Sequence, residues 1–523
     1  MAYGICAERI YRAEGELKMI VVESREIRNL ENIAAGNGIP VSSLMERAGR
    51  NVADFAERII KEKNLGNVCI ICGTGNNGGD GFVAAGILAD KCKVSVILAD
   101  SFPHSLLASN YFNILPHSVV MHDFTENHDE SSEIIKNADM IVDCIYGIGF
   151  NGALKTNVAE VITYCNQNKK AVKIAVDVPS GIICDSGVVV SECFHADYTL
   201  SFTALKPLHV LYPSLDYCGE VIVSDVGIPE NILDTCAYTM KTTDEFIEKN
   251  RLRERKKSAH KGTNGTLLSV CGSYGMAGAA MLAGEAALRS GVGLLKTALP
   301  RSIYNIAAQR IPEGVFLPLE QTPDGKISAR EFQKIFFELS NSASALLLGC
   351  GMGVNNDTKQ LTAMLIQNSP KPMVIDADGL NCIQGNIDVL RLAVSPVIIT
   401  PHPKEMARLI DSDLRTIQAY RYDVAKDFAM EYRVTVVLKG ANTIIATPDG
   451  SVYVNLTGNN GMAKGGSGDV LAGMMASLLA QGLSTETAAV YAVYYHGLAG
   501  DKCREKMSAR TMLPSDMIRE IDF

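Results

Sequence analysis

Two glycine-rich segments, each carrying a carboxylate, have the residue types and spacing that could do chemistry. The first reads GTGNNGGDG over 73–81, and the second reads GNNGMAKGGSGD over 458–469. Each lies where a turn leads into an expected helix, so each can direct backbone N–H groups at an anion. Asp80 and Asp469 stand at the mouths of these two anion sites. Two such sites in one chain predict two chemical centres that act on related phosphorylated molecules.

The first segment begins like a dinucleotide-binding turn and then departs from it. A GxGxxG pattern over 73–78 follows an apolar, strand-like run. Asp100 follows at about the 20-residue spacing of that fingerprint. Taken alone, the pattern predicts a dehydrogenase, or only a structural turn between a strand and a helix. The amide and carboxylate side chains within 76–80 exceed what a pyrophosphate cradle needs, and they favour a different chemistry.

Polar residues also follow two other expected strands of the first half. Asp143 ends one apolar run before the loop 144–152, and Asp177 ends another before Val-Pro-Ser-Gly at 178–181. Ligands of open parallel sheets bind at the carboxyl ends of the strands, so these ends and the first loop should converge on one crevice. Carboxylate, amide and hydroxyl oxygens gathered there could hold a hard cation. The alternative is that Asp143 and Asp177 only cap turns.

The second segment ends at the expected start of a helix. Gly-Ser-Gly-Asp at 466–469 precedes the apolar run 470–479, so N–H groups at the helix start can form an anion hole favoured by the helix dipole. Asp469 falls in the first turn, where it can take a proton from a substrate hydroxyl. The segment is not a P-loop, because Lys464 precedes Gly465 and no Gly-Lys-Ser/Thr occurs. It resembles the Gly-x-Gly-Asp signature of ribokinase-like phosphotransferases; the alternative is a structural helix cap.

Composition and charge limit the class of protein. The 523 residues are 47% hydrophobic and 20% charged, which is ordinary for a globular chain of several domains. A net charge of −9 and a pI near 5.6 argue against a nucleic-acid-binding protein. No signal peptide or run of 18 apolar residues is visible, so we expect a cytoplasmic protein that does not cross a membrane. The 14 cysteines are expected to be reduced, including Cys69 and Cys72, which should point to opposite faces of one strand.

Alternating strand-like and helix-like runs must position these residues. The alternation predicts parallel sheets covered by helices on both faces, hence the α/β class. Ser24 is expected to cap the first helix. The charge run 251–257 is expected to be a solvated helix or a linker near a domain boundary at 238–262. The expected strands are 68–72, 93–98, 140–144, 173–178, 198–202 and 220–223 in the first half, and 266–271, 345–348, 373–375, 397–400 and 434–438 in the second.

Several motifs of the first half together carry a resemblance to a known family. Val-Glu-Ser-Arg-Glu-Ile-Arg at 22–28, the Gly-Asn-Asn-Gly-Gly-Asp-Gly loop ending at Gly81, the Asp143 strand end and Asp-Val-Pro-Ser-Gly at 177–181 resemble the NAD(P)H-hydrate epimerase family, the YjeF N-terminal domain. The resemblance covers roughly 19–230. It implies a Rossmann-like, three-layer fold and the interconversion of the R and S forms of hydrated NADH and NADPH.

The epimerase resemblance also implies roles for individual residues. Asn77, Asp143 and Ser180 would bind a potassium ion. The hydrated nicotinamide carries a hydroxyl on the carbon next to the ring nitrogen, and one positioned carboxylate, which we assign to Asp177, would suffice as acid and base. The expected substrate contacts are Asn76, Asn77, Gly78, Gly79, Asp80, Gly147, Ile148, Gly149, Phe150, Asn151, Gly152, Ala153 and Asp177.

Motifs of the second half resemble ADP-dependent NAD(P)H-hydrate dehydratase, over roughly 245–520. The resemblance implies a ribokinase-like fold. Lys404 stands where that family usually has Gly in a His-Pro-x-Glu motif. Besides the glycine-rich end, the motifs are KGTNG at 261–265, GSYGMAGA at 272–279, GCGMG at 349–353, DADGLN at 376–381, TPHPKE at 400–405 and KGANT at 439–443.

The dehydratase resemblance assigns a substrate set and a nucleotide set. Asp469 would deprotonate the ring hydroxyl, which attacks the terminal phosphoryl of ADP, with Mg²⁺ and the anion hole stabilising the transferred charge. His402 could instead be a turn residue. The substrate contacts would be Ala279, Gly353, His402 and Asp469, and the nucleotide contacts Lys439, Gly440, Ala441, Asn442, Thr443 and Gly468.

The sequence thus predicts a bifunctional repair enzyme with an epimerase domain at 19–240 and a dehydratase domain at 245–523. Its expected partners are hydrated NADH or NADPH, ADP, and further copies of the chain in a homo-oligomer. ADP would leave as AMP and phosphate. The alternative is a ribokinase-like small-molecule kinase fused to a Rossmann-like binding module.

Overall fold

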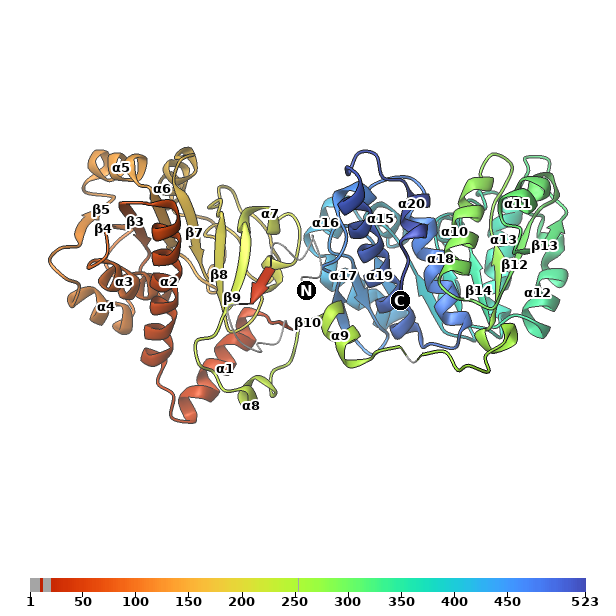
Figure 1. Ribbon diagram of the computed structural model, residues 1–523, viewed down its shortest axis with the longest axis horizontal. Coiled ribbons are helices and arrows are strands. Elements are labelled where there is room, and N and C mark those ends of the chain that lie inside the picture. The colour runs from red at the N-terminus through yellow and green to blue at the C-terminus, as the bar shows by residue number, and fades with distance from the viewer. Residues whose placement is uncertain (1–9, 13–19, 253) are drawn as a thin grey trace. The chain divides into compact units, whose positions relative to one another are not determined.

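The chain folds into two units in this computed structural model, which describes residues 10–12, 20–252 and 254–523 (Figure 1). The first unit ends at Met240 and the second runs from Lys241 to Phe523. No helix of the described portion is long and apolar enough to cross a membrane.

An eight-stranded parallel sheet forms the centre of the first unit. Its strand order is β1-β9-β8-β7-β6-β3-β4-β5, so the chain winds outward in both directions from β3 and β6. The strands are β1 (Ile10–Arg12), β3 (Asn67–Cys72), β4 (Lys93–Leu98), β5 (Val120–Asp123), β6 (Met140–Cys144), β7 (Val172–Val176), β8 (Tyr198–Phe202) and β9 (Glu220–Ser224); β2 (Ile20–Val21) precedes the first helix. The helices are α1 (Ser24–Gly36), α2 (Val41–Lys63), α3 (Asn76–Leu88), α4 (Leu106–Asn113), α5 (His128–Asn137), α6 (Thr156–Gln167), α7 (Leu215–Cys218) and α8 (Glu230–Leu233).

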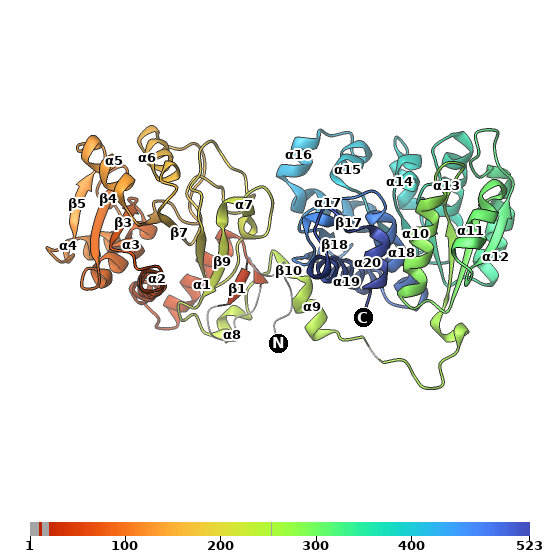
Figure 2. The same ribbon diagram turned by 45° about the horizontal axis from the view of Figure 1, so that its top comes forward.

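Helices cover this sheet on both faces. Helices α2 and α3 pack on one face, and α5 and α6 pack on the other (Figure 2). The two cores divide strand β3 between them: Cys72 belongs to the α2/α3 core and Cys69 to the α5/α6 core. Both thiols are free and buried. The predicted opposite orientation of this cysteine pair is therefore confirmed, as is the α/β class.

Helix α2 shows how the sequence produces an element. Its apolar residues recur at helical spacing and form one buried stripe that packs against α3. The helix ends where Asn64 adopts a left-handed conformation with φ of 54°. The stripe contains Leu44, Ala48, Val52, Phe55 and Ile59.

The second unit contains a larger sheet that is mostly parallel. Its strand order is β13-β12-β11-β14-β15-β16-β17-β18-β19-β10, and only the β17/β18 and β18/β19 pairs are antiparallel. The strands are β10 (Met240–Thr242), β11 (Thr266–Val270), β12 (Leu294–Pro300), β13 (Val315–Leu319), β14 (Ala345–Leu348), β15 (Met373–Ile375), β16 (Val397–Ile399), β17 (Thr435–Leu438), β18 (Ile444–Ala446) and β19 (Val452–Val454). The helices are α9 (Thr243–Lys249), α10 (Ala277–Arg289), α11 (Tyr304–Arg310), α12 (Phe332–Asn341), α13 (Asn356–Asn368), α14 (Asp378–Ile383), α15 (Pro403–Leu409), α16 (Leu414–Ala419), α17 (Arg421–Tyr432), α18 (Ser467–Ala480), α19 (Thr485–Lys506) and α20 (Pro514–Arg519).

Helix α18 lies at the centre of the second core. From Val470 to Ala480 its residues are all buried, packed among α10, α19 and strand β14. A helix that is apolar on every side is a core helix, so its first turn is held rigidly at the edge of the sheet.

One local prediction needs correction. Ser24 does not cap the first helix: Glu23 occupies the cap position, and the Ser24 hydroxyl donates a hydrogen bond of 2.6 Å to Asp185. Local propensity does not reveal a partner that is distant in sequence. The charge run 251–257 contains no helix among its described residues and connects α9 to the segment before β11, so the linker alternative holds.

Candidate active sites

The first glycine-rich loop lies at the carboxyl end of β3, as predicted, and opens helix α3. At Gly73 the loop passes so close to the neighbouring strand end that no side chain would fit there. A Cβ atom there would lie 2.0 Å from the carbonyl oxygen of Ile145. The Gly73 N–H donates to the carbonyl of Cys144, which ends β6. The two strand ends therefore share one edge of the sheet.

The three residues predicted to hold potassium lie together at this edge. The carboxylate of Asp143 accepts hydrogen bonds from the hydroxyl and the N–H of Ser180, at 2.7 and 2.8 Å. The amide of Asn77 donates to the carbonyl of Tyr146 at 3.1 Å, and the Tyr146 N–H donates to the Ser180 hydroxyl at 2.9 Å. The backbone at Tyr146 thus joins the three side chains into one polar cluster.

The Asp143 carboxylate is buried without a cationic partner among the described residues. It is fully inaccessible to solvent, and its burial raises its pKa to about 6 despite the hydrogen bonds from Ser180 and Ile145. A buried carboxylate without a counter-charge is unfavourable. A monovalent cation among the surrounding oxygens would offset that charge, so the residues fit the implied potassium ion.

Asp177 forms a buried ion pair that the sequence does not reveal. Its Oδ1 lies 2.5 Å from Nζ of Lys206, which also donates to the Ser201 hydroxyl at 3.0 Å and the Phe202 carbonyl at 2.8 Å. The Lys206 side chain is 0% exposed. Asp177 itself adopts a left-handed backbone with φ of 65°. The only sequence signal for this pair is a lone lysine within the apolar run 204–208.

Two further carboxyl groups face Asp177. Burial raises the pKa of Asp80 well above its usual range, and the charges of Asp177 and Glu31 raise it further. Burial also raises the pKa of Glu31, with Asp177 acting in the same direction. Asp80 is a predicted substrate contact, whereas Glu31 comes from α1 and was missed. The crevice therefore gathers three carboxyl groups, two of which have a raised pKa.

The predicted substrate loop at 147–153 borders this cluster. A Cβ on Gly147 would lie 3.4 Å from Asn77, and one on Gly149 would lie 3.0 Å from the Arg28 guanidinium. The ring of Phe150 stacks on that of Tyr146, with centroids 4.7 Å apart. Asn76 accepts a hydrogen bond of 2.5 Å from Ser105 and so turns toward the start of α4.

The acidic residue of the dinucleotide fingerprint is occupied by protein partners. Asp100 forms an ion pair with Lys155 and accepts a hydrogen bond of 3.2 Å from Asn157. Its carboxylate therefore binds side chains of this protein, whereas in a dehydrogenase the corresponding carboxylate binds the ribose hydroxyl of the cofactor.

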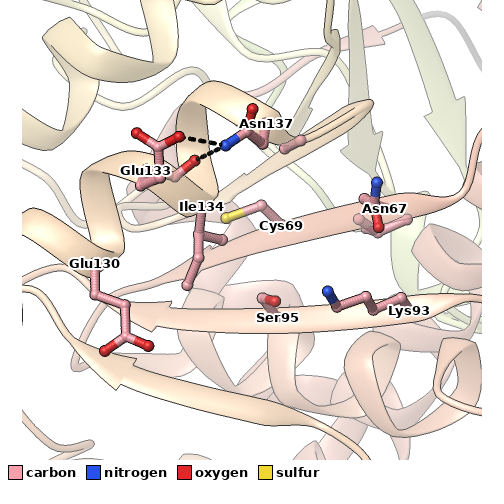
Figure 3. Close-up of a pocket in the computed structure, with 10 residues that line it drawn as sticks. Asn67, Cys69, Lys93, Ser95, Glu130, Glu133, Ile134 and Asn137 are labelled. Atoms are coloured by element: carbon pink, nitrogen blue, oxygen red, sulfur yellow. Dashed lines mark hydrogen bonds between the residues drawn. The ribbon is translucent and has the colours of Figure 1, made fainter.

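A hollow of about 240 Å³ in the first unit does not coincide with these residues (Figure 3). It lies where β3 and β4 begin, beside Asn67 and Lys93, and α5 closes it with Glu130 and Glu133. The predicted residues sit at the opposite, carboxyl edge of the same strands. The hollow is therefore not the predicted crevice.

In the second unit, Asp469 occupies the first turn of α18 beside a second carboxylate. Asp376, which follows β15, is buried. Its carboxylate forms an ion pair with Nζ of Lys439 at 2.6 Å and accepts a hydrogen bond from the Thr400 hydroxyl at 2.7 Å. The thiol of Cys350 lies 3.8 Å from Asp376. A Cβ on Gly468 would lie 3.4 Å from the Lys439 ammonium. The structure thus brings Gly468, Asp469 and Lys439 together, as predicted.

The surroundings of Asp469 favour a base that works near neutral pH. Burial and the charge of Asp376 raise its pKa to about 6, although the Cys350 thiol and the Lys439 ammonium oppose the shift. A general base is most useful when its pKa lies near the working pH. Asp469 meets that condition without a direct ion-pair partner among the described residues.

Ligand atoms of Cys350, Asp376 and Asp469 lie within 4.8 Å of one another. This group does not suit the expected Mg²⁺ by itself. Mg²⁺ prefers six oxygen ligands, whereas the group supplies a thiol, and Lys439 already occupies one Asp376 oxygen. Mg²⁺ usually binds through one or two carboxylates together with nucleotide phosphates, and Asp469 is free to contribute in that way.

His402 and Glu405 form a rigid corner next to Lys439. His402 caps α15, where its ring Nδ1 accepts hydrogen bonds from the backbone N–H groups of Lys404 and Glu405. The backbone N–H of His402 donates to the Glu405 carboxylate at 2.8 Å. Burial and the Lys439 charge lower the pKa of His402, so its ring is neutral. Its Nε2 lies 3.5 Å from the Glu405 carboxylate, and the side chain is 43% exposed. Lys404 fits this turn although glycine was expected there.

Gly353 and Ala279 border the same edge of the sheet from two other strand ends. The Gly353 N–H donates to Asp378 at 2.8 Å, and its φ of 73° is one that glycine readily adopts. The methyl group of Ala279 lies 2.8 Å from where a Cβ on Gly351 would be. Gly353 therefore lies on the glycine loop that follows β14, and Ala279 lies in the first turn of α10, after the glycine loop that follows β11.

The predicted nucleotide loop at 439–443 joins β17 to β18. Its Lys439 N–H donates to the Pro401 carbonyl, which ties the loop to the His402 corner. Its other side rests on Arg421, whose guanidinium donates to the carbonyl of Ala441 at 2.7 Å. Sequence reasoning missed Arg421, because nothing local distinguishes it from a surface arginine.

Comparisons with known proteins match both halves of the chain. The family model described as YjeF-related protein N-terminus matches residues 41–208, and the model described as NAD(P)H-hydrate dehydratase matches residues 267–522. A curated relative from Moorella thermoacetica, named bifunctional NAD(P)H-hydrate repair enzyme Nnr, is 35% identical over 96% of this chain and 95% of its own length. The chain belongs to the bifunctional NAD(P)H-hydrate repair enzymes.

Another member of the repair-enzyme family matches over nearly the same length. The Escherichia coli repair enzyme is 31% identical over 94% of this chain and 91% of its own length. The structure of the Bacillus subtilis ADP/ATP-dependent NAD(P)H-hydrate dehydratase, co-crystallised with ATP and Mg²⁺, is 31% identical and covers 53% of this chain and 94% of its own, with a TM-score of 0.47. The family models and relatives confirm the predicted family. The roles of individual residues stay predictions.

Proposed function

We propose that the protein restores hydrated NADH and NADPH to their active forms. The first unit interconverts the R and S forms of the hydrate, and the second dehydrates the S form at the expense of ADP, releasing AMP and phosphate. Family membership supports both activities. The observation that carries the proposal is the placement of Asp469 in the first turn of α18, beside the Lys439 ammonium and the glycine backbone of the loop.

The first site can exchange protons with the hydrated ring. Loss of the ring hydroxyl requires a proton donor, and Asp80 would serve as that donor, since its raised pKa favours the protonated carboxyl. Return of water to the other face requires an acceptor, and the Asp177 carboxylate lies beside it in its ion pair with Lys206. Opposed carboxyl groups of this kind divide acid and base roles between them. Water leaving from one face and adding to the other inverts the centre.

Potassium would lie among Asn77, Asp143 and Ser180. When bound, it supplies a fixed positive charge beside the substrate loop. The chain's own residues orient that loop, because the Tyr146 backbone receives hydrogen bonds from Asn77 and gives one to Ser180. The cluster therefore couples the ion site to the position of Gly147 and its neighbours.

The second site can turn a poor leaving group into a good one. Asp469 takes the proton of the ring hydroxyl, whose oxygen attacks the terminal phosphorus of ADP as the bond to AMP breaks. Backbone N–H groups at the start of α18 and the Lys439 ammonium stabilise the charge on the transferred phosphoryl group. The ring nitrogen lone pair then expels phosphate, and loss of a proton from the adjacent carbon restores the reduced nicotinamide.

The nucleotide would bind along the 439–443 loop, and Asp469 would help to hold Mg²⁺ there. When bound, Mg²⁺ would neutralise phosphate charge. The neutral His402 ring and the Gly353 backbone lie at the same strand ends and would border the hydrated dinucleotide. A cytoplasmic location is part of the proposal, supported by the free state of every described cysteine.

The test is to incubate a mixture of both hydrate epimers with the full chain and either ADP or no nucleotide. We expect NADH absorbance to return for both epimers only with ADP, with one phosphate released per NADH. A small-molecule kinase would instead accumulate a stable phosphoester and release no phosphate. Failure to return NADH from either epimer would overturn the proposal.

A further inference from the structure

Arg421 is a buried arginine that lies directly behind the predicted nucleotide loop. It is the first residue of α17 and is only 6% exposed. Its guanidinium donates to three carbonyl oxygens of one turn: Leu438 at 3.3 Å, Ala441 at 2.7 Å and Asn442 at 3.3 Å. The Arg421 side chain therefore bridges three carbonyl groups along the connection between β17 and β18.

The charge of this guanidinium has no acidic partner among the described residues. Burial lowers the pKa of Arg421 to about 10, and no neighbouring carboxylate opposes that shift. Its Nε is buried without a hydrogen-bond partner. Burying an uncompensated charge is strongly unfavourable. Carbonyl dipoles offset only part of it, so an anion at this loop would be favoured.

The turn is shaped to fit the guanidinium. A Cβ on Gly440 would lie 2.8 Å from Nη2 of Arg421, and Gly440 has a φ of 154°. Because each peptide is planar and trans, every carbonyl turned toward Arg421 turns the next N–H away from it. The backbone dipoles of Ala441 and Asn442 therefore point their positive ends to the side opposite the guanidinium.

We propose that Arg421 is a positioning residue for the phosphates of the adenine nucleotide. It fixes the 438–442 turn in the conformation that receives ADP and gives the turn a net positive charge. The inference rests on the proposed use of ADP by the second unit. It predicts that the charge of Arg421 matters for ADP but not for an uncharged nucleoside at the same loop.

The experiment measures the Kd of ADP and of adenosine by titration calorimetry on the full chain. Arg421→Met is expected to raise the Kd of ADP at least tenfold and the Kd of adenosine less than threefold. Arg421→Lys keeps the charge but cannot bridge three carbonyls, so it should recover part of the ADP affinity. Arg415→Met, an exposed position on α16, is the matched control and should bind ADP as the unaltered chain does.

Retained adenosine binding, which depends on the same unit as Arg421, verifies that this unit is folded in each variant. Unchanged ADP affinity in Arg421→Met would overturn the inference. Equal weakening of ADP and adenosine would also overturn it, because Arg421 would then only support the turn. Absence of ADP binding by the unaltered chain would instead contradict the proposed function itself.

Discussion

The two sites differ in how a lysine meets the carboxylates. In the first unit, the buried Lys206 ammonium contacts Asp177 directly. In the second unit, Lys439 contacts Asp376, while Asp469 stands beside that pair with a pKa raised to about 6. In the proposed mechanism, the first arrangement holds one charge in place and leaves proton donation to Asp80. The second leaves the proposed base, Asp469, without an ion-pair partner among the described residues and able to accept a proton from a hydroxyl. The chemistry follows from which carboxylate the lysine takes.

The largest expected effect comes from removing the unpaired base. Asp469→Asn should lower the rate of ADP-dependent NADH return on the order of 10²–10⁴-fold, the usual contribution of a general base. R/S interconversion, followed by chromatography of the two hydrates, should be unchanged. The matched control is Asp378→Asn, which keeps its hydrogen bond to Gly353. An undiminished rate in Asp469→Asn would contradict the role of that carboxylate.

The next effect comes from removing the paired lysine of the first site. Lys206→Met leaves Asp177 buried without its counter-charge, which destabilises by about 3–5 kcal/mol. The denaturant concentration at which the first unit unfolds should fall accordingly, and interconversion of the R and S hydrates should be lost. The double variant Lys206→Met/Asp177→Asn should recover much of the stability but not the activity. If the single variant is as stable as the unaltered chain, the ion pair has no structural role.

A third prediction concerns pH. Because Asp469 must be ionised to act as base, kcat/KM of the dehydratase should fall about tenfold per pH unit below the pKa near 6. Asp378 raises that pKa through its charge, so Asp378→Asn should move the acid limb to lower pH. A profile that is flat down to pH 5, or a limb that moves upward, would contradict this assignment.

The smallest effect concerns Asp143 and potassium. Its pKa rises from 3.8 to about 6 on folding, so the folded state binds more protons across that interval. The free energy of unfolding should therefore fall as pH rises from 4 to 6. Asp143→Asn should make this slope shallower by the share that Asp143 contributes, and potassium, compared with choline, should also make it shallower in the unaltered chain. Identical slopes in potassium and choline would exclude an ion at this carboxylate.

The sequence predicts the strand ends well, because apolar runs bounded by Gly, Asp and Ser mark both the strands and the residues that follow them. Asp143 and Asp177 were placed at the correct strand ends for that reason, and Asp469 was placed at a helix start because a glycine-rich turn precedes an apolar run. The partners of these residues were not predictable. Lys206, Glu31 and Arg421 reach the sites from elements whose packing is set by tertiary contacts, and only the fold brings them near.

Burial likewise decides properties that no spacing reveals. The motif at 376–381 indicated a functional segment, but the contact between Asp376 and Lys439 spans 63 positions. The same holds for the raised pKa of Asp80, which depends on burial and on charges from two other elements. Residue type predicts which chemical groups are present, and long-range packing sets their pKa values and their partners.

The most direct test of the account follows the purified R hydrate through both sites. With ADP, the unaltered chain should return all of it as NADH with one phosphate per NADH. Asp177→Asn should return R hydrate only at the spontaneous rate of interconversion while consuming the S hydrate normally. Return of the R hydrate by Asp177→Asn at the unaltered rate would contradict the claim that the two sites act in series on one substrate.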